Sequence, residues 1–283
     1  MKINKLILSG ASTKVPAYVG VIKALVDNNI INLDLEGIDE IHVCSISMLI
    51  SLFMLFDLSP AIMDGCCMGV RFENLIQVDK ITIRSLFEEY GVSDNLLLGT
   101  AVRNMIKEKY NKEDMTLKEL YEIKPILLNV KCTNVNKSCV EYFNVHTHPD
   151  ISIITLLCMT TAIPFLFKPV EYKGCLYVDG GTHGSFNEEN MDKTSLGIWI
   201  RGESEINETK VINMFDYCQK VLMTTAYDKK HMDSERTIHV VNELHFSEFS
   251  VSDDVKIKLM QDGYNQTVDH IKKYKLTNDL FSD

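Results

Sequence analysis

The first 58 residues contain two strand-like segments, each followed within a few residues by a helix-like segment. Residues 5–8 (KLIL) and 40–44 (EIHVC) are short apolar runs with β character, and apolar side chains recur at helical spacing in residues 15–28. Residues 46–58 form a second helix-like run directly after the second strand. Strand, crossover helix and strand predict a parallel βαβ unit, in which ligands bind at the carboxyl ends of the strands. We therefore expect an α/β fold with a mainly parallel central sheet.

The remaining segments extend this pattern along the chain. Residues 59–124 are expected to be mainly helical, with a helix that ends near residue 109 and a capping box at Thr116 and Glu119. A helix-like run over residues 151–161 is ended by Pro164. Strands are predicted at 125–133, 139–144, 174–178, 196–200 and 237–241, a hairpin turn at 134–137, a loop at 202–210 and a last helix at 252–275. We expect one domain over residues 1–283, with a core at 3–200, a helical insertion at 59–124 and a C-terminal strand and helix at 237–275.

The charge balance excludes partners that are bound by bulk positive charge. The 283 residues include 39 acidic and 29 basic side chains, which gives a formal net charge of -10. Binding to phosphates requires clustered Lys and Arg. We expect no nucleic-acid partner, and any contact with a membrane should be local and apolar.

The apolar runs and the cysteines predict where the protein acts. The longest apolar run, residues 46–56, is much shorter than the ~20 residues that cross a bilayer, and the N-terminal run is too short for a signal peptide. The eight cysteines are scattered, which indicates buried free thiols in a reducing compartment. The pair His146 and His148 lacks the companions of a zinc site. We expect a cytoplasmic protein with no transmembrane segment, no metal and no other cofactor.

Ser45 lies at the predicted turn between the second strand and the helix that follows it. A serine at such a turn can project its hydroxyl from a sharp bend, close to the positive end of the helix dipole, and act as a nucleophile. Serine is also a common N-cap residue, so a purely structural role is the alternative.

The loop after the first strand, residues 9–16, consists mostly of small residues. Small residues let backbone amides face a developing oxyanion, and Lys14 can add positive charge. The alternative is an ordinary connection in which Pro16 begins a helix.

Asp179 follows the predicted strand at 174–178 and precedes Gly180 and Gly181. A carboxylate held there can orient and deprotonate a nearby hydroxyl as a general base. Asp-Gly-Gly is also a common turn sequence, which needs no catalysis.

The order of these three segments resembles that of the patatin-like phospholipase family. That family has a glycine-rich loop after its first strand, a G-x-S-x-G turn after its second and an Asp-Gly-Gly with the second member of a Ser/Asp dyad. Residues 9–25 resemble the family pattern S-G-G-G-x-K-G-x-x-x-x-G-x-L-x-A-L, and residues 162–170 resemble A-x-P-x-x-F-x-P. The resemblance implies a three-layer α/β/α sandwich with a mainly parallel sheet.

The resemblance also implies roles for single residues. Ser45 corresponds to the nucleophile and Asp179 to its base. The implied activity is that of a phospholipase A-type lipid acyl hydrolase, which acts on phospholipid or another acyl lipid at a membrane surface. The oxyanion hole corresponds to the backbone around Gly10, Ala11 and Ser12, with Lys14, Gly180 and Gly181 as supporting residues.

Other residues near these segments are expected to play lesser parts. Cys44 precedes the apex of the turn, and His183 is expected to be a surface or loop residue because the family's dyad needs no histidine. Residues 165–167 (FLF) either line an acyl channel or belong to the core.

The chain departs from the family pattern at its glycines. Ala11 and Ser12 replace loop glycines, Val15 replaces the glycine after Lys14, and Val43 and Ser47 replace those around Ser45. A non-glycine residue at positive φ costs on the order of 1–2 kcal/mol, and loss of one oxyanion donor lowers turnover ~10²–10³-fold.

The lost glycines leave two functions open. The chain is expected to be a divergent viral family member, since its many Ile, Asn and Lys residues are typical of an AT-rich genome. It is either a hydrolase whose rate the altered loop lowers, or a catalytically impaired pseudoenzyme with a structural, binding or virion-assembly role. The second role implies oligomeric or virion partners and a place in the virion.

Overall fold

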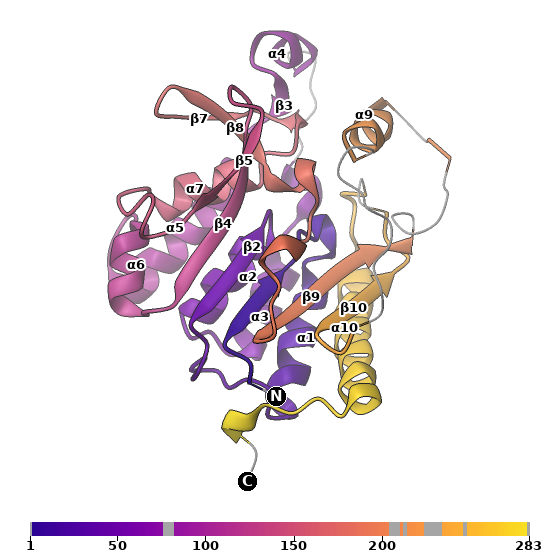
Figure 1. The fold of residues 1–283 in the computed structure, drawn as a ribbon. Helices are drawn as coiled ribbons and strands as arrows, with labels where there is room; N and C mark the ends of the chain where they lie inside the picture. Colours follow the sequence, from indigo (N-terminus) through magenta and orange to yellow (C-terminus); the bar gives the residue numbers. More distant parts are fainter. Residues whose placement is uncertain are drawn as a thin grey trace.

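A mixed sheet forms the centre of the molecule, here a computed structural model that describes residues 2–75, 82–203, 210–211, 214–223, 234–245 and 248–281 (Figure 1). Within these residues the sheet has eight strands, in the order β10-β9-β1-β2-β4-β8-β7 with β5 paired to β4. The first five of this order run parallel, while β8, β7 and β5 are antiparallel to their partners. The strands are β1 (Lys5–Leu8), β2 (Glu40–Cys44), β4 (Leu127–Asn134), β5 (Cys139–Phe143), β7 (Val170–Tyr172), β8 (Cys175–Asp179), β9 (Ser195–Gly202) and β10 (Thr237–Asn242).

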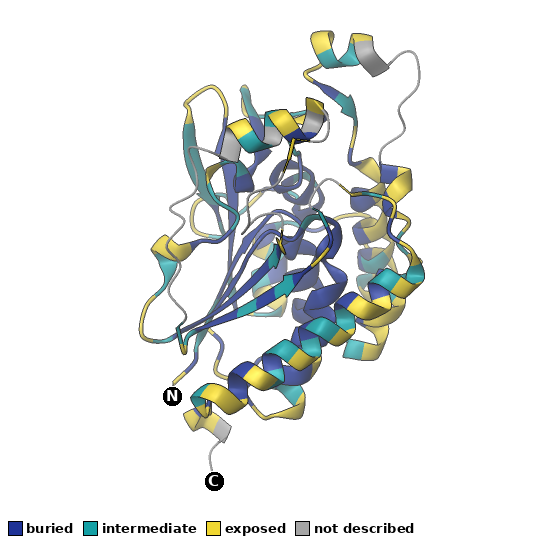
Figure 2. Ribbon diagram, turned by 90° about the vertical axis from the view of Figure 1, so that its right-hand side faces the viewer, coloured by how far each residue is buried: buried dark blue, intermediate teal, exposed yellow. Residues whose placement is uncertain are grey.

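Helices flank this sheet, so the fold is the predicted α/β sandwich. Figure 2 shows the buried strands in the middle of the molecule and α10 along one side, with exposed residues on its outer face. The helices are α1 (Pro16–Asp27), α2 (Ser47–Leu55), α3 (Pro60–Gly69), α4 (Thr82–Glu88), α5 (Leu96–Tyr110), α6 (Leu117–Ile123), α7 (Ile153–Thr160), α9 (Met214–Met223) and α10 (Asp253–Tyr274). Short 3-10 turns are η1 (Ser12–Lys14), η2 (Phe72–Leu75), η3 (Gly180–His183), η4 (Glu188–Asn190) and η5 (Asp279–Phe281).

The first strand shows why these apolar runs become central strands. Leu6 and Leu8 belong to the main core, whereas Ile7 packs on the opposite face against Phe186 and Trp199. Strands that are buried on both faces need apolar side chains at successive positions, so the run loses the alternation of a half-exposed strand. The sheet therefore fixes β1 and its neighbours within the core.

Most predicted elements form close to their expected bounds. The capping box is present, since Thr116 Oγ1 accepts a hydrogen bond from the Glu119 amide (3.2 Å) and the Glu119 carboxylate accepts one from the Thr116 amide (2.8 Å). The predicted loop at 202–210 begins within β9, and its residues 204–209 lie outside the described residues. In the described part of the chain, no helix has the length and apolar character needed to span a bilayer.

The described part of the insertion at 59–124 is mainly helical, as expected, and contains one short strand that was not predicted. Residues 91–93 form β3 (Gly91–Ser93), which pairs in parallel with β6 (Phe165–Phe167) in a second, two-stranded sheet. A Cβ at Gly91 would lie 2.4 Å from the backbone of Phe167, so only glycine permits this approach. Strands of three residues paired across such a separation leave no local periodicity in the sequence. Because this pairing ties the insertion to the rest of the chain, we infer a single domain over residues 1–283.

Helices α1 and α10 pack closely through two glycines. A Cβ at Gly263 would lie 2.2 Å from the Ala17 carbonyl oxygen, and one at Gly20 would lie 1.9 Å from the Met260 carbonyl oxygen. Both contacts are with helix backbone, which has no flexible end that can move aside. The glycines therefore set the distance between these helices.

We predict that Gly263→Ala destabilises the protein, because the methyl group forces the two helices apart. The free energy of unfolding should fall by about 1–3 kcal/mol, as expected for overpacking. The matched control is Gly65→Ala in α3, where a Cβ meets nothing within 4 Å and better helix propensity should add up to ~1 kcal/mol. Urea unfolding of both variants measures the difference, and equal effects would contradict the packing argument.

Candidate active site

Ser45 occupies the turn between β2 and α2 in a strained backbone conformation. Its φ is 60°, in the left-handed region that non-glycine residues rarely adopt. Its amide donates a hydrogen bond to Thr160 Oγ1 (2.9 Å), and Thr160 Oγ1 donates to the Lys131 carbonyl oxygen (2.8 Å). The N-cap of α2 is Ile46 without a side-chain cap, so the Ser45 hydroxyl does not cap the helix. The geometry is that of a sharp strand-to-helix turn with the serine at its apex.

Asp179 ends β8, and its carboxylate reaches the serine. Ser45 Oγ donates to Asp179 Oδ2 at 2.6 Å, although the two residues are 134 positions apart. The Gly181 amide donates to the other oxygen, Oδ1, at 2.7 Å. Asp179 thus caps the Asp-Gly-Gly turn with one oxygen and accepts the hydrogen bond from Ser45 with the other.

Gly180 is required by the turn that follows Asp179. A Cβ at Gly180 would lie 2.4 Å from the Lys131 carbonyl oxygen, whereas a Cβ at Gly181 would lie 3.0 Å from Asp179 Oδ1. The first is a clash with backbone and the second a tight contact with the carboxylate itself. Both predicted supporting glycines therefore shape the surroundings of Asp179.

Burial dominates the electrostatics of the pair. It raises the pKa of Asp179 to about 6, although the hydrogen bonds from Ser45 and Gly181 and the positive charge of Lys131 act in the opposite direction. Both side chains are buried, Ser45 at 7% and Asp179 at 5% exposure. A carboxyl with a pKa near 6 is mostly ionised at neutral pH and still accepts a proton readily.

The predicted oxyanion loop is placed beside Ser45, but one of its amides is already bonded. A Cβ at Gly10 would lie 3.3 Å from the Ser45 Cβ, which places this loop against the serine. The Gly10 amide donates to the Ser185 carbonyl oxygen at 2.8 Å, so in this structure it is not available as an oxyanion donor. Ala11 has φ -135°, whereas Ser12 has φ 49°. The positive φ that the family's glycines accommodate freely is therefore adopted here by a serine.

The remaining substitutions of the family's glycines are accommodated in different ways. Val43 lies within β2 and is fully buried in the core. The Ser47 hydroxyl accepts from the Cys44 amide (3.0 Å) and lies 2.8 Å from the Cys44 carbonyl oxygen, so it braces the turn. The Lys14 side chain is buried, with 2% exposure, in η1.

Other candidates from the sequence lie outside the Ser45–Asp179 contact. Burial raises the pKa of the Cys44 thiol, which disfavours the thiolate. The His183 ring lies 3.2 Å from Thr182 Oγ1 and 3.3 Å from Thr133 Oγ1. His148 packs against Phe143.

The segment 165–167 has a mixed environment. Leu166 and Phe167 are buried in the core, which favours the core interpretation for these two, whereas Phe165 is 44% exposed.

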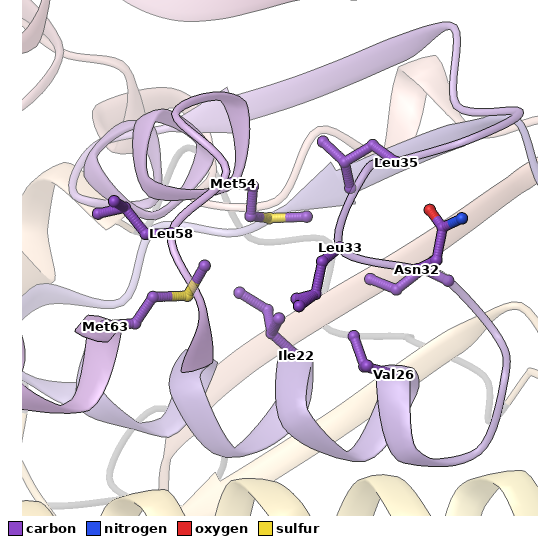
Figure 3. Close-up of a pocket in the computed structure, with 9 residues that line it drawn as sticks. Ile22, Val26, Asn32, Leu33, Leu35, Met54, Leu58 and Met63 are labelled. Carbon is purple, nitrogen blue, oxygen red and sulfur yellow. The ribbon is translucent and has the colours of Figure 1, made fainter. Parts of the chain in front are cut away.

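A small apolar pocket lies away from these residues (Figure 3). It is lined by side chains from α1, the loop after it, α2 and the start of α3, among them Ile22, Met54 and Met63. None of its lining residues belongs to the site around Ser45.

Two residues of the site were not found from the sequence. Thr160 connects the turn at Ser45 to β4, and Lys131 is a buried lysine, 2% exposed, beside both turns. Nothing local marks Thr160. A lysine in the middle of the apolar run 125–133 is a signal that can be used, because lysine is almost never fully buried unless it is paired.

A family model described as patatin-like phospholipase matches residues 49–191. The match begins four residues after Ser45 and includes Asp179.

Two viral proteins are similar in sequence to this chain. The uncharacterized protein R571 of Acanthamoeba polyphaga mimivirus is 22% identical over 289 residues, which covers 96% of this chain and 95% of that protein. The probable lipid hydrolase 463L of Invertebrate iridescent virus 6 is 27% identical over 142 residues, 46% of this chain and 48% of that protein. Both relatives are viral, in line with the expectation from the sequence.

Solved structures share the fold at low sequence identity. VipD from Legionella pneumophila superposes with a TM-score of 0.65 at 16% identity, over 97% of this chain and 67% of that one. The type III effector ExoU from Pseudomonas aeruginosa gives a TM-score of 0.55 at 12% identity, over 97% of this chain and 54% of that one. These similarities extend the fold assignment to nearly the whole chain.

We predict that Asp179→Asn stabilises the protein at neutral pH. The folded-state pKa of about 6 lies above the unfolded value near 3.9, so the folded state loses stability as the pH rises from about 4 to about 6. The uncharged amide removes this cost, and the gain should be on the order of 1–3 kcal/mol at pH 8 and vanish near pH 4. Urea unfolding across this pH range measures it.

A control variant, Glu119→Gln, is expected to change the stability at neutral pH in the opposite direction. The hydrogen bond from Lys112, with that of the capping box, lowers the pKa of Glu119 to about 2, so Glu119→Gln should lose stability at neutral pH but not below about pH 2. A stability difference of Asp179→Asn that is the same at pH 4 and pH 8 would show that the pKa of Asp179 is not raised.

Proposed function

Because the chain belongs to the patatin-like phospholipase family, we propose that it is a phospholipase A-type lipid acyl hydrolase with Ser45 and Asp179 as its catalytic dyad. The observation that carries this proposal is the 2.6 Å hydrogen bond from the Ser45 hydroxyl to the buried carboxylate of Asp179. The name of the iridescent-virus relative, a probable lipid hydrolase, supports the same class of substrate.

The geometry suits a two-step hydrolysis. Asp179 takes the proton of the Ser45 hydroxyl while Oγ attacks the acyl carbonyl carbon, and the protonated Asp179 then gives its proton to the departing alkoxide of the lipid. Water attacks the acyl-enzyme next, with Asp179 as base, and the fatty acid leaves as Ser45 regains its proton. One carboxylate serves both steps because its second oxygen stays bonded to the Gly181 amide, which holds its orientation.

Stabilisation of the oxyanion is the role that we propose for the loop after β1. We propose that the backbone around Gly10, Ala11 and Ser12 binds the oxyanion, with the buried Lys14 nearby, and that the Gly10 amide takes part only when it leaves the Ser185 carbonyl oxygen. The N-terminus of α2 directly after Ser45 contributes the positive end of its dipole.

The Gly10–Ser185 hydrogen bond favours a second candidate function. If this bond persists when substrate binds, the site has one oxyanion donor fewer, and such a loss lowers turnover ~10²–10³-fold. The chain would then use its fold for binding or for virion assembly with viral partners. We propose a cytoplasmic location with peripheral contact to membranes for the hydrolase, and a virion location for this alternative.

The hydrolase predicts covalent labelling of Ser45 by a fluorophosphonate probe and fatty-acid release from mixed phospholipid vesicles. Ser45→Ala and Asp179→Asn should each lose at least about 10³-fold in rate, because each removes one member of a unit that acts together. The matched control is Ser51→Ala in α2, the helix that follows Ser45, where the buried hydroxyl donates to the Met48 carbonyl oxygen (2.7 Å). It should keep the wild-type rates.

Two outcomes separate the candidate functions. Labelling that persists in Ser45→Ala contradicts the assignment of the nucleophile. If the wild type shows no labelling and no fatty-acid release, the hydrolase is contradicted and the impaired scaffold is favoured.

A further inference from the structure

Lys131 lies on β4 at the point where the pairing with β2 ends and the pairing with β8 begins. In the sheet, Lys131 is paired with Cys44, the residue before Ser45, and Cys132 is paired with Asp179. The Lys131 side chain is 2% exposed. A charged group is thus buried at the one place where the nucleophile and the base come together.

The Lys131 ammonium is held by groups that follow Asp179 in the chain. Its Nζ donates to the carbonyl oxygens of His183 and Gly184, both at 3.1 Å, and lies 3.5 Å from Glu189 Oε1. The Tyr142 hydroxyl donates to the same carboxylate oxygen. The side chain therefore ties the segment from the Asp-Gly-Gly turn to η4 onto β4.

The backbone of Lys131 supports the other half of the site. Its carbonyl oxygen accepts from Thr160 Oγ1, which in turn accepts from the Ser45 amide, and Gly180 packs against that same carbonyl. One residue thereby contacts the turn on the Asp179 side directly and the turn at Ser45 through a single hydroxyl.

The charge of Lys131 has a physical consequence for Asp179. Burying an ammonium is costly unless it is paired, and beside two carbonyl oxygens Lys131 has the carboxylate of Glu189 at 3.5 Å, which is itself 53% exposed. Asp179 is a buried carboxyl that also needs a compensating charge when it is ionised, and the positive charge of Lys131 favours this ionised form.

We propose that Lys131 is a positioning residue of the dyad, whose ammonium holds the turn after Asp179 and keeps the carboxylate ionised as the base for Ser45. This inference rests on the proposed hydrolase and assigns a regulating charge to that same site.

The elements around the two turns of the site carry several titratable groups, and the charge of Lys131 acts among them. Cys44 and Cys132 are buried thiols whose raised pKa keeps them neutral, so they add no charge. The neighbouring groups are Lys131 and Cys132 from β4, Cys44 from β2, His183 from η3, Glu189 from η4, Lys14 from η1 and, on α9, which contacts η3, the pair Asp216–Lys220.

The test is the pH dependence of fluorophosphonate labelling at Ser45. The pH–rate profile of the wild type should have an ascending limb with its midpoint near pH 6, as Asp179 ionises. Lys131→Met should move this limb upward by on the order of 1 pH unit, so labelling falls about tenfold near pH 5 and little at pH 8. Lys131→Arg keeps the charge and should keep the wild-type limb.

The matched control is Lys256→Met in α10. Lys256 is also fully buried, and its Nζ also donates to two backbone carbonyls, those of Met68 (3.0 Å) and Val70 (2.6 Å). Its loss should cost stability without moving the limb. A uniform fall in rate at every pH in Lys131→Met, or an equal shift in Lys256→Met, overturns the proposal.

A second readout separates this inference from the proposed function. If the wild type is not labelled, the hydrolase fails, and ¹³C NMR of the Asp179 carboxyl, assigned by its loss in Asp179→Asn, still reports its titration. An upward shift in Lys131→Met supports the electrostatic role, and an unchanged titration overturns it.

A further variant tests the proposal if Lys131→Met does not fold. Glu189→Gln removes the carboxylate that lies 3.5 Å from the Lys131 ammonium and is itself 53% exposed, so the charge of Lys131 is less compensated at the site. The titration of Asp179 should then move downward, and an unchanged or higher value overturns the proposal.

Discussion

The hydrogen bond between Ser45 Oγ and Asp179 Oδ2 depends on how β2 and β8 pair with β4. On β4, β2 pairs with residues 127–131, and β8 pairs with the continuation, residues 132–134. Because β8 runs antiparallel to β4, its carboxyl end returns to the place where β2 ends. The serine and the carboxylate meet there at 2.6 Å, and a slip of one register would turn Asp179 to the other face of the sheet.

The sequence predicted this site through its local turns. Ser45 and Asp179 stand where strands end, and small residues mark the loop at Gly10, so local patterns and the family resemblance were sufficient to nominate them. The central strands were also predictable, since burial on both faces requires continuous apolar runs. The antiparallel direction of β8 was not, because a short, mostly apolar run such as residues 175–179 has the same pattern in either direction.

Contacts between distant segments could not be predicted from the sequence, and the reason is physical. The β3–β6 pairing, the support of the Ser45 amide by Thr160 and the bond from the Gly10 amide to Ser185 each join segments that only the finished fold brings together. The sequence indicated the lost glycines as sites of strain, and of these substituted positions Ser12 is the one with a positive φ. It gave no means to tell that Ser12 keeps the positive φ while Val43 sits unstrained inside β2.

The site lowers the stability of the fold in several independent ways, and this favours the hydrolase over an inert scaffold. Ser45 and Ser12 hold positive φ, at on the order of 1–2 kcal/mol each. Asp179 is buried with a raised pKa, and Lys131 is buried beside it. A scaffold that served only for assembly would be more stable with small or apolar residues at these positions. Strain at Ser45, a buried carboxylate at Asp179 and the buried Lys131 beside them suit an activated serine nucleophile better than an inert turn.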